Sequence, residues 1–256
     1  MELTAGDGHK FSAYRADPAE APKGAVIVLQ EVFGVNSHIR KVADQFAAKG
    51  YVAIAPSLFD RIKPGVELGY DESALAEGLS LMKQLEVDQA LSDIQATVDS
   101  VKDAGKVAIV GYCWGGTLAY TSANRVGGLA CAIGYYGSGI VATTSEKRKI
   151  PTLLHFGEAD SLIPFEDVIQ FRAQRPDVSA FSYPAAGHGF NCDERDSYVA
   201  TAAEQATGRT LFWISQYLEG QPPIQLKNSG SYAAAKVEKK KKAKPAGGDD
   251  LGPPMA

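Results

Sequence analysis

The stretch Gly111-Tyr112-Cys113-Trp114-Gly115-Gly116 decides how this chain is interpreted. It follows a compact apolar run at residues 106–110, which predicts a buried strand, and it precedes a helical pattern over residues 117–125. A sharp strand-to-helix turn with glycines two positions before and two positions after a reactive side chain is typical of a nucleophile elbow. Glycine allows the close backbone approach that such a turn requires. The pattern therefore predicts that Cys113 attacks a carbonyl carbon.

Two other interpretations of this segment exist. Cysteine is among the most buried residue types, so a lone cysteine beside a glycine turn can simply be a core residue. A phosphate-binding loop is disfavoured, because residues 111–116 lack both the G-x-G-x-x-G spacing and a Gly-Lys-Ser/Thr ending. The residues further along the chain distinguish the catalytic from the packing interpretation.

The composition of the 256-residue chain is that of a globular protein with a large core. Hydrophobic residues make up 45% and charged residues 22%. No apolar stretch is long enough to span a bilayer, and the N-terminus has no signal-like apolar region. The three cysteines show no metal-ligand spacing and fit a reducing compartment. We therefore expect a cytoplasmic protein with no membrane partner.

The charge divides the chain into two parts. Residues 221–256 contain seven Lys against three Asp or Glu, a net of +4, which leaves −8 on residues 1–220. An acidic body argues against a nucleic-acid partner. The Lys-rich segment has too little apolar surface to bury and predicts disorder, with a localisation signal or a contact to an acidic partner as alternatives. We expect one domain over residues 1–220 and a low-complexity basic tail over residues 221–256.

Apolar runs alternate with helical patterns along the predicted domain. Strands are predicted at residues 25–29, 51–55, 106–110, 129–135, 152–156 and 180–183. Helices are predicted at residues 39–49, 73–85, 87–103, 117–125, 165–175 and 197–218, with a long loop at residues 57–73. This alternation predicts an α/β fold, in which a mostly parallel central sheet carries helices on both faces. Ligands of such sheets bind at the carboxyl ends of the strands, where Cys113 falls.

A cysteine nucleophile needs a nearby base, because a thiol with its ordinary pKa is mostly protonated near neutral pH. His188 is the candidate, since it follows a predicted strand in the glycine-flanked loop at residues 186–190. A plain surface histidine is the alternative on position alone. His155 lies inside a predicted strand and is expected in the core. We expect His9 to be exposed, and His38 to cap or pack near a helix start.

Asp160 is the candidate acid, because it comes directly after the predicted strand at residues 152–156. A carboxylate there can accept a hydrogen bond from one imidazole nitrogen and stabilise the imidazolium. A turn or helix-capping aspartate is the alternative. Cys113, Asp160 and His188 each follow a strand, in the chain order of the α/β-hydrolases. Together they predict a catalytic triad on an α/β-hydrolase fold.

Five ordered motifs over roughly residues 10–220 resemble the dienelactone hydrolase family. The matching segments are residues 30–36, 50–56, 111–116, 155–160 and 187–190. The resemblance implies that Cys113, Asp160 and His188 hydrolyse a cyclic enol ester such as dienelactone, with no metal or organic cofactor. It also implies that Glu31 contacts the resting thiol and swings away when substrate binds. The backbone N–H groups of Val32 and Trp114 match the oxyanion donors of the family.

The arginines depart from the family pattern. Prototype members bind the substrate carboxylate with one arginine in the middle insertion and another a few residues after the histidine. Residues 62–124 of this chain contain no arginine, and Cys192 stands near the second position. Arg61 and Arg195 remain as candidate anion partners, with surface roles as the alternative. Aromatic candidates for the pocket wall, which could equally be core residues, are Phe33, Tyr70, Trp114 and Phe190.

The leading hypothesis is a cysteine-dependent hydrolase of a small-molecule ester or lactone. A general carboxylesterase is the near alternative, because the family's arginines are missing. A non-catalytic thiol sensor or protein-interaction module is the alternative from another class, motivated by Cys113 at a helix start and by the basic tail. A monomer is compatible with the sequence, which does not determine the oligomeric state.

Overall fold

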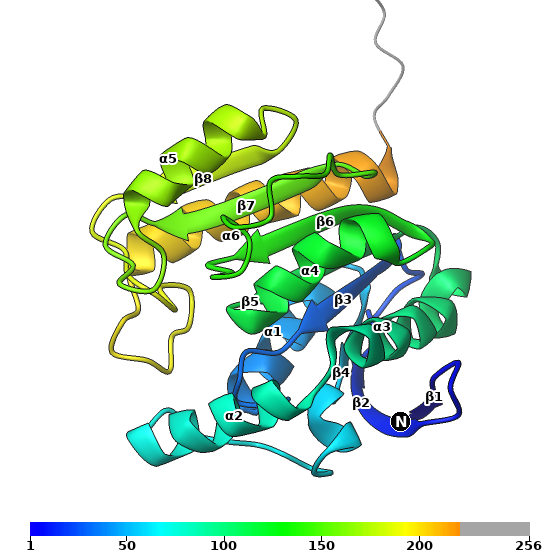
Figure 1. Ribbon diagram of the computed structural model, residues 1–256. Helices are drawn as coiled ribbons and strands as arrows, with labels where there is room; N and C mark the ends of the chain where they lie inside the picture. The colour runs from blue at the N-terminus through cyan, green and yellow to red at the C-terminus, as the bar shows by residue number, and fades with distance from the viewer. Residues whose placement is uncertain (221–256) are drawn as a thin grey trace, which may run out of the picture. The chain divides into compact units, whose positions relative to one another are not determined.

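A computed structural model describes residues 1–220; the predicted basic tail, residues 221–256, lies outside the described residues. One eight-stranded sheet forms the centre, with the strand order β1-β2-β4-β3-β5-β6-β7-β8 (Figure 1). The strands from β4 to β8 in this order pair in parallel. They are β4 (Val52–Pro56), β3 (Ala25–Leu29), β5 (Val107–Tyr112), β6 (Leu129–Tyr135), β7 (Thr152–Gly157) and β8 (Ser179–Tyr183). The predicted mostly parallel sheet is thus confirmed.

Two antiparallel strands at one edge were not predicted. β1 (Glu2–Thr4) pairs with β2 (Lys10–Ala16), which in turn pairs with β4. In β2 the side chains of Phe11 and Ala13 are buried and alternate with more exposed neighbours. This alternation is the period-2 signal of a strand with one face in the core, whereas β1, with three residues, is too short to give a signal.

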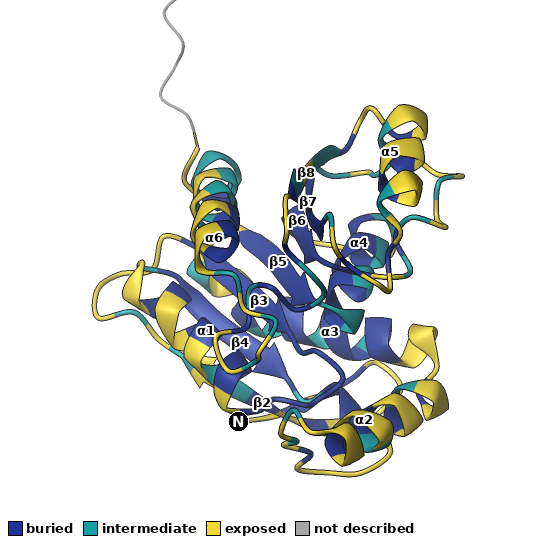
Figure 2. Cartoon of the chain, turned by 90° about the vertical axis from the view of Figure 1, so that its left-hand side faces the viewer, coloured by how far each residue is buried: buried dark blue, intermediate teal, exposed yellow. Residues whose placement is uncertain are grey.

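Helices cover both faces of the sheet (Figure 2). On one face, Val42 of the first helix packs in the same cluster as Val26 and Val28 of β3. On the other face, Ile94 and Leu118 pack with Ile27. Because both faces of β3 are covered, all five of its residues are buried, which explains its continuous apolar sequence. The helices are α1 (Ser37–Ala48), α2 (Glu72–Gln84), α3 (Val87–Val101), α4 (Trp114–Arg125), α5 (Phe165–Gln174) and α6 (Ala200–Ile214).

Local structure explains where two of the helices begin: a side-chain cap starts α1, and the nucleophile elbow starts α4. The Asn36 side chain accepts a hydrogen bond from the Ile39 N–H and caps α1, as a side-chain cap should. α4 begins at Trp114, three residues earlier than predicted, because the chain turns into it directly after Cys113. α6 begins at Ala200 instead of residue 197. The predicted loop at residues 57–73 contains a short 3₁₀ turn, Leu58–Arg61.

The strand order creates a switch point between β3 and β5. From β3 the chain continues to β4 on one side, and from β5 it continues to β6 on the other side. Open α/β sheets bind ligands outside the carboxyl ends of the strands at such a point. Glu31 and Val32 follow β3, and Cys113 follows β5. The fold therefore brings these three residues to the edge of the sheet where a ligand is expected.

Candidate active site

Cys113 occupies a strained turn between β5 and α4. Its φ of 55° lies in the left-handed region, which is uncommon for a residue with a side chain. A Cβ on Gly111 would lie 1.9 Å from the Gly115 carbonyl oxygen, and a Cβ on Gly115 would lie 2.5 Å from the Gln30 oxygen. Only glycine fits at both positions. The turn leaves the Cys113 side chain half-buried at the N-terminus of α4, where the helix dipole favours a negative charge.

Two hydrogen bonds join Cys113, His188 and Asp160. The His188 Nε2 lies 3.0 Å from the Cys113 Sγ, and the His188 Nδ1 lies 2.9 Å from the Asp160 Oδ2. Asp160 follows β7, and His188 lies in the loop after β8. The Asp160 side chain is fully buried and the His188 side chain is 10% exposed. The structure therefore brings together the three side chains that the sequence predicts as a triad.

The surroundings of His188 favour the imidazolium. Burial alone lowers the pKa of His188, but the hydrogen bonds to Asp160 and to Cys113 outweigh it and raise this pKa to about 10. The other carboxylate oxygen of Asp160 accepts the Leu162 N–H at 2.8 Å, which holds the carboxylate in place. An imidazolium beside a cysteine sulfur stabilises the thiolate, which is the nucleophilic form.

The sequence predicts the backbone N–H groups of Trp114 and Val32 as oxyanion donors. Trp114 is the first residue of α4, and the first N–H groups of a helix have no acceptor within the helix. The Val32 N–H, in the turn after β3, donates to no backbone oxygen in the loops and turns of residues 1–220. Gly78 of α2 packs directly on this turn, since a Cβ there would lie 2.1 Å from the Val32 oxygen. The Val32 peptide is therefore held by a neighbouring helix.

A second cluster of site residues surrounds Glu31, which is 1% exposed. Its Oε1 lies 3.5 Å from the Arg195 Nη1. The Arg195 guanidinium lies over the rings of Phe33 and Tyr70, at 5.6 Å from each centroid. These two rings contact each other edge to face at 4.7 Å. Four of the predicted residues thus form one partly buried group with an arginine as its cation.

The Glu31 carboxylate differs from the resting arrangement that the family resemblance implies. The Cys113 sulfur is hydrogen-bonded to His188, while Glu31 pairs with Arg195. Within residues 1–220 the predicted contact between the Glu31 carboxylate and the Cys113 thiol is therefore not found. The second carboxylate oxygen, Oε2, is buried and has no hydrogen-bond partner among residues 1–220.

Arg61, the other candidate anion partner, has a different environment. Its guanidinium pairs with Asp93 of α3 at 2.7 Å and with Asp7 at 2.8 Å, and its side chain is 7% exposed. Burial raises the pKa of Asp93, while the arginine opposes this shift. Because two carboxylates already occupy its donors, Arg61 links the 3₁₀ turn to α3 and the N-terminal segment. The structure therefore argues against Arg61 as a substrate ligand.

The remaining aromatic candidates have packing partners. Phe190 is fully buried and contacts the rings of Tyr136 and Tyr183 at 5.3 and 5.1 Å. Trp114 is stacked on Phe59 at 5.3 Å. Both contacts account for the aromatic side chain without a ligand, in agreement with the alternative that the sequence left open.

The other histidines have structural roles. His155 is buried in the core, where its nitrogens contact the hydroxyls of Tyr183 at 2.7 Å and Thr210 at 3.1 Å. His38 is buried at the start of α1 and contacts Asp193 at 3.3 Å. His9 is partly buried and stacks on Phe11, so it is less exposed than predicted.

The sequence did not predict the contacts of two residues near the site. The Cys192 thiol donates to the Tyr70 hydroxyl at 3.3 Å, and burial together with the Glu31 charge raises the pKa of Cys192 to about 11. Tyr136 directly follows β6, and its ring contacts His188 edge to face at 5.2 Å. The sequence signal for Cys192 was its position four residues after His188. Tyr136 has no local signal, because its neighbours come from three other strand ends.

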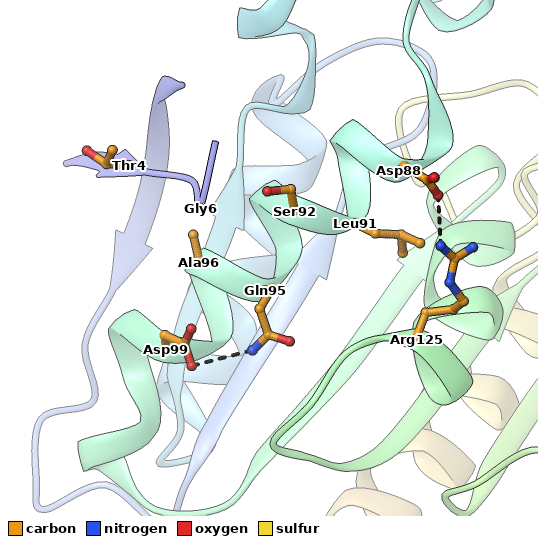
Figure 3. Close-up of a pocket in the computed structure, with 9 residues that line it drawn as sticks. All are labelled: Thr4, Gly6, Asp88, Leu91, Ser92, Gln95, Ala96, Asp99 and Arg125. Atoms are coloured by element: carbon orange, nitrogen blue, oxygen red, sulfur yellow. Dashed lines mark hydrogen bonds and ion pairs between the residues drawn. The ribbon is translucent and has the colours of Figure 1, made fainter. Parts of the chain in front are cut away.

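A surface pocket of about 450 Å³ lies apart from these residues, between the N-terminal segment and α3 (Figure 3). Within it Asp88 pairs with Arg125 at 2.9 Å, and Gln95 contacts Asp99 at 3.4 Å. It contains no residue of the Cys113 or Glu31 clusters. The pocket is therefore separate from the candidate active site.

Comparisons with known proteins agree with the fold and the motifs. The model of the dienelactone hydrolase family matches residues 11–218. A Pseudomonas putida carboxymethylenebutenolidase is 31% identical over 84% of this chain and 95% of its own length. A Synechocystis protein assigned as a carboxymethylenebutenolidase is 37% identical over 77% of this chain and 88% of its own length.

A solved structure supports the same relationship. The crystal structure of a Klebsiella pneumoniae protein assigned as a dienelactone hydrolase superposes with a TM-score of 0.74 at 29% identity, covering 85% of this chain and 98% of that one. Within residues 1–220, no helix has the length and apolar character that a membrane span requires. The chain belongs to the dienelactone hydrolase family and is a hydrolase of ester or lactone bonds.

Proposed function

We propose that this enzyme hydrolyses small esters and lactones of the dienelactone type through a thioester on Cys113. The observation that carries the proposal is the pair of hydrogen bonds made by His188, 3.0 Å to the Cys113 sulfur and 2.9 Å to Asp160. Together they connect a nucleophile, a base and an orienting carboxylate. Relatives named carboxymethylenebutenolidases support the lactone as the substrate class.

In the acylation step, the Cys113 thiolate attacks the carbonyl carbon and forms a C–S bond. The carbonyl oxygen becomes an oxyanion, which accepts hydrogen bonds from the N–H groups of Val32 and Trp114. Loss of one such donor typically costs about 100–1000-fold in rate. The intermediate then collapses with cleavage of the C–O bond, and the leaving enolate takes a proton from the His188 imidazolium.

In the deacylation step, neutral His188 accepts a proton from water, and the resulting hydroxide attacks the thioester. Collapse of the second intermediate breaks the C–S bond and releases the acid. The Cys113 thiolate and the His188 imidazolium are restored together. Asp160 keeps the imidazole in one tautomer throughout, because its carboxylate accepts a hydrogen bond from the His188 Nδ1–H.

The thioester is the intermediate that distinguishes this mechanism, and it should be trapped by acid quenching. During turnover of an activated aryl ester, we expect mass spectrometry to find the acyl group on the peptide that contains Cys113. Cys131→Ala should keep the adduct, since Cys131 is fully buried in β6, and Cys113→Ala should lose it. An acyl group found on another residue would reject the thioester, and so would the absence of an acyl group when the enzyme is saturated with the ester.

Arg195 is proposed to bind a carboxylate of the substrate. Its side chain is 21% exposed and lies beside Glu31 and over the rings of Phe33 and Tyr70. Arg195 therefore supplies the positive charge of the Glu31 cluster. A substrate carboxylate would replace Glu31 as its partner. Arg195 is the better candidate of the two arginines, because its contact to Glu31 is longer, at 3.5 Å, than the two carboxylate contacts of Arg61, at 2.7 and 2.8 Å.

We expect Arg195→Gln to raise the KM for a carboxylate-bearing lactone about 10-fold or more, because a hydrogen bond to a charged group is lost. The KM for a neutral ester of similar size should change little. Arg125→Gln, which removes a guanidinium in an exposed surface pair, is the matched control for charge. Steady-state kinetics with both substrates measure the effect, and an equal change for both would remove Arg195 from carboxylate recognition.

A general carboxylesterase is the second candidate function. It is favoured by the contact between Arg195 and Glu31, which leaves this cation already partnered. The comparison of kcat/KM for the wild-type enzyme decides between the two. A large preference for the neutral ester would reject the lactonase and keep the hydrolytic triad.

We also propose that the enzyme acts in the cytoplasm, in keeping with three free cysteines.

A further inference from the structure

A cavity of about 280 Å³ lies between α1 and α6, on the face of the sheet that both helices cover (Figure 2). Its lining comes from these two helices, from the carboxyl ends of β5 and β6, and from the loop that follows His188. It contains no residue of the triad and neither Glu31 nor Arg195. The cavity is therefore a candidate for a second binding site.

Apolar and aromatic side chains form the walls of this cavity. Val42 and Phe46 come from α1 and Leu211 comes from α6, while the rings of Tyr112 and Tyr135 lie 4.8 Å apart on the sheet side. A dry cavity of about 150 Å³ with apolar walls is large enough for benzene. The space between α1 and α6 therefore has room for one flat ring with a polar substituent.

Two hydroxyls on the sheet side of the cavity differ in their hydrogen bonding. The Tyr135 hydroxyl is hydrogen-bonded to Thr210 at 2.6 Å. The Tyr112 hydroxyl makes no hydrogen bond within residues 1–220, although Tyr112 is only 3% exposed. Burial raises the pKa of Tyr112 well above its ordinary value, so the hydroxyl keeps its proton. Because a buried donor without a partner costs free energy, Tyr112 offers a free hydrogen bond to an occupant of the cavity.

The charge of the lining favours an anion. Lys49 is the only charged side chain among the described residues that line the cavity, and its ammonium pairs with no carboxylate of residues 1–220. A neighbouring cavity of about 370 Å³ differs, because its Lys41 pairs with Asp193 and because Glu204 also lines it. The cavity that contains Lys49 thus has one uncompensated positive charge and no acidic side chain.

We propose that the cavity between α1 and α6 binds a small carboxylate with a flat aromatic or unsaturated body. The apolar walls accommodate the body, while Lys49 and the Tyr112 hydroxyl supply the charge and the free donor for an anion. Hydrolysis of an ester or lactone bond releases a carboxylic acid, so the enzyme itself produces ligands of this chemistry. The strand that carries Tyr112 continues directly into Cys113, so the site borders the nucleophile elbow.

Benzoate is the probe that tests the inference, and benzamide is the uncharged control of the same shape. In an NMR titration of the full chain, benzoate should shift the methyl signals of Val42 and Leu211 until they saturate. We expect a Kd in about the millimolar range or below for so small a ligand. Benzamide should bind about 10-fold more weakly, because its hydrogen bonds involve no charge.

Two substitutions examine the anion contacts. Lys49→Gln should weaken benzoate binding about 2–5-fold, the size of an exposed ion pair, and should leave benzamide binding unchanged. Lys83→Gln is the matched control, since Lys83 is an exposed lysine in the last turn of α2 and does not line the cavity. Tyr112→Phe keeps the ring and removes the donor, and it should weaken benzoate binding about 10-fold.

A filling substitution distinguishes this site from the active site, where benzoate can also meet Arg195. Leu211→Trp should abolish the benzoate-induced shift of the Val42 methyl signals, while competitive inhibition of ester hydrolysis by benzoate persists. Arg195→Gln should weaken the inhibition and keep the Val42 shift. Thermal unfolding of each variant checks the fold, and Lys49→Gln replaces Leu211→Trp in this comparison if the tryptophan variant lacks a cooperative transition.

Three results would overturn the inference. The first is the absence of a saturable shift at Val42 and Leu211, and the second is equal affinity for benzoate and benzamide. The third is a Val42 shift that follows Arg195→Gln instead of the substitutions in the cavity, which would assign the bound benzoate to the active site. The hydrolytic mechanism is tested separately by Cys113→Ala, so failure of one proposal leaves the other standing.

Discussion

Replacing Cys113 by alanine is expected to reduce kcat on the order of 10⁵-fold or more, because the removal of a nucleophile that acts as part of a unit is nearly as damaging as removal of the whole unit. His188 and Asp160 then have no sulfur to activate, and the thioester route is closed. Steady-state hydrolysis of a lactone and of an activated aryl ester measures the loss.

The control variants for Cys113→Ala separate the nucleophile from cysteine in general. Cys131→Ala removes a thiol that is fully buried on β6, and it should keep wild-type kcat in any protein that remains folded. Alanine has a Cβ, as cysteine does, so the substitution leaves the steric restriction on the backbone at φ 55° the same. Turnover of both substrates by Cys113→Ala at near the wild-type rate would exclude Cys113 from the mechanism.

Asp160→Asn is expected to lower kcat on the order of 10³–10⁴-fold, the size of the effect when the orienting carboxylate of a triad becomes an amide. The amide nitrogen can present a donor to the His188 Nδ1, which favours the wrong tautomer. The buried position of Asp160 means that no water replaces the lost charge. Stopped-flow measurement of the acylation step should show the loss, and a reduction of less than about 10-fold would contradict a triad.

The same variant changes the protonation of His188 in a defined direction. In the wild type, hydrogen bonds raise the pKa of His188 to about 10 against the effect of burial. A raised pKa in the folded state contributes stability that is fully present below the ordinary histidine value of about 6.5 and is lost as the pH rises toward 10. Without the Asp160 charge, burial dominates and the pKa falls. An NMR titration of the imidazole follows this change, and an unaltered titration in Asp160→Asn would contradict it.

The parallel strands could be predicted because burial on both faces leaves a continuous apolar run. β3 and β5 are buried at every position, so their sequences contain no polar interruption. β2 has one face in the core and could have been recognised from the alternation around Phe11. The start of α4 was predicted too late, because Trp114 enters the helix directly from a turn whose geometry depends on the packing of Gly115 against Gln30.

The identity of the anion partner shows why residue type alone was insufficient. Arg61 and Arg195 were equivalent candidates in the sequence. Asp93 and Asp7 occupy the donors of Arg61, whereas Arg195 lies beside Glu31 and two aromatic rings. The difference arises from segments that are far apart in the chain, and charge or spacing near each arginine does not reveal it.

The nucleophile, its elbow and the order of its predicted partners were readable from local pattern, because a strand-turn-helix with glycines at fixed offsets is encoded by neighbouring residues. The contacts between Cys113, His188 and Asp160 required the folded chain, since three strand ends meet only when the sheet has formed. The unsatisfied hydroxyl of Tyr136 and the free oxygen of Glu31 depended on tertiary structure entirely. Burial and orientation are properties of what surrounds a side chain, and its sequence neighbours do not specify them.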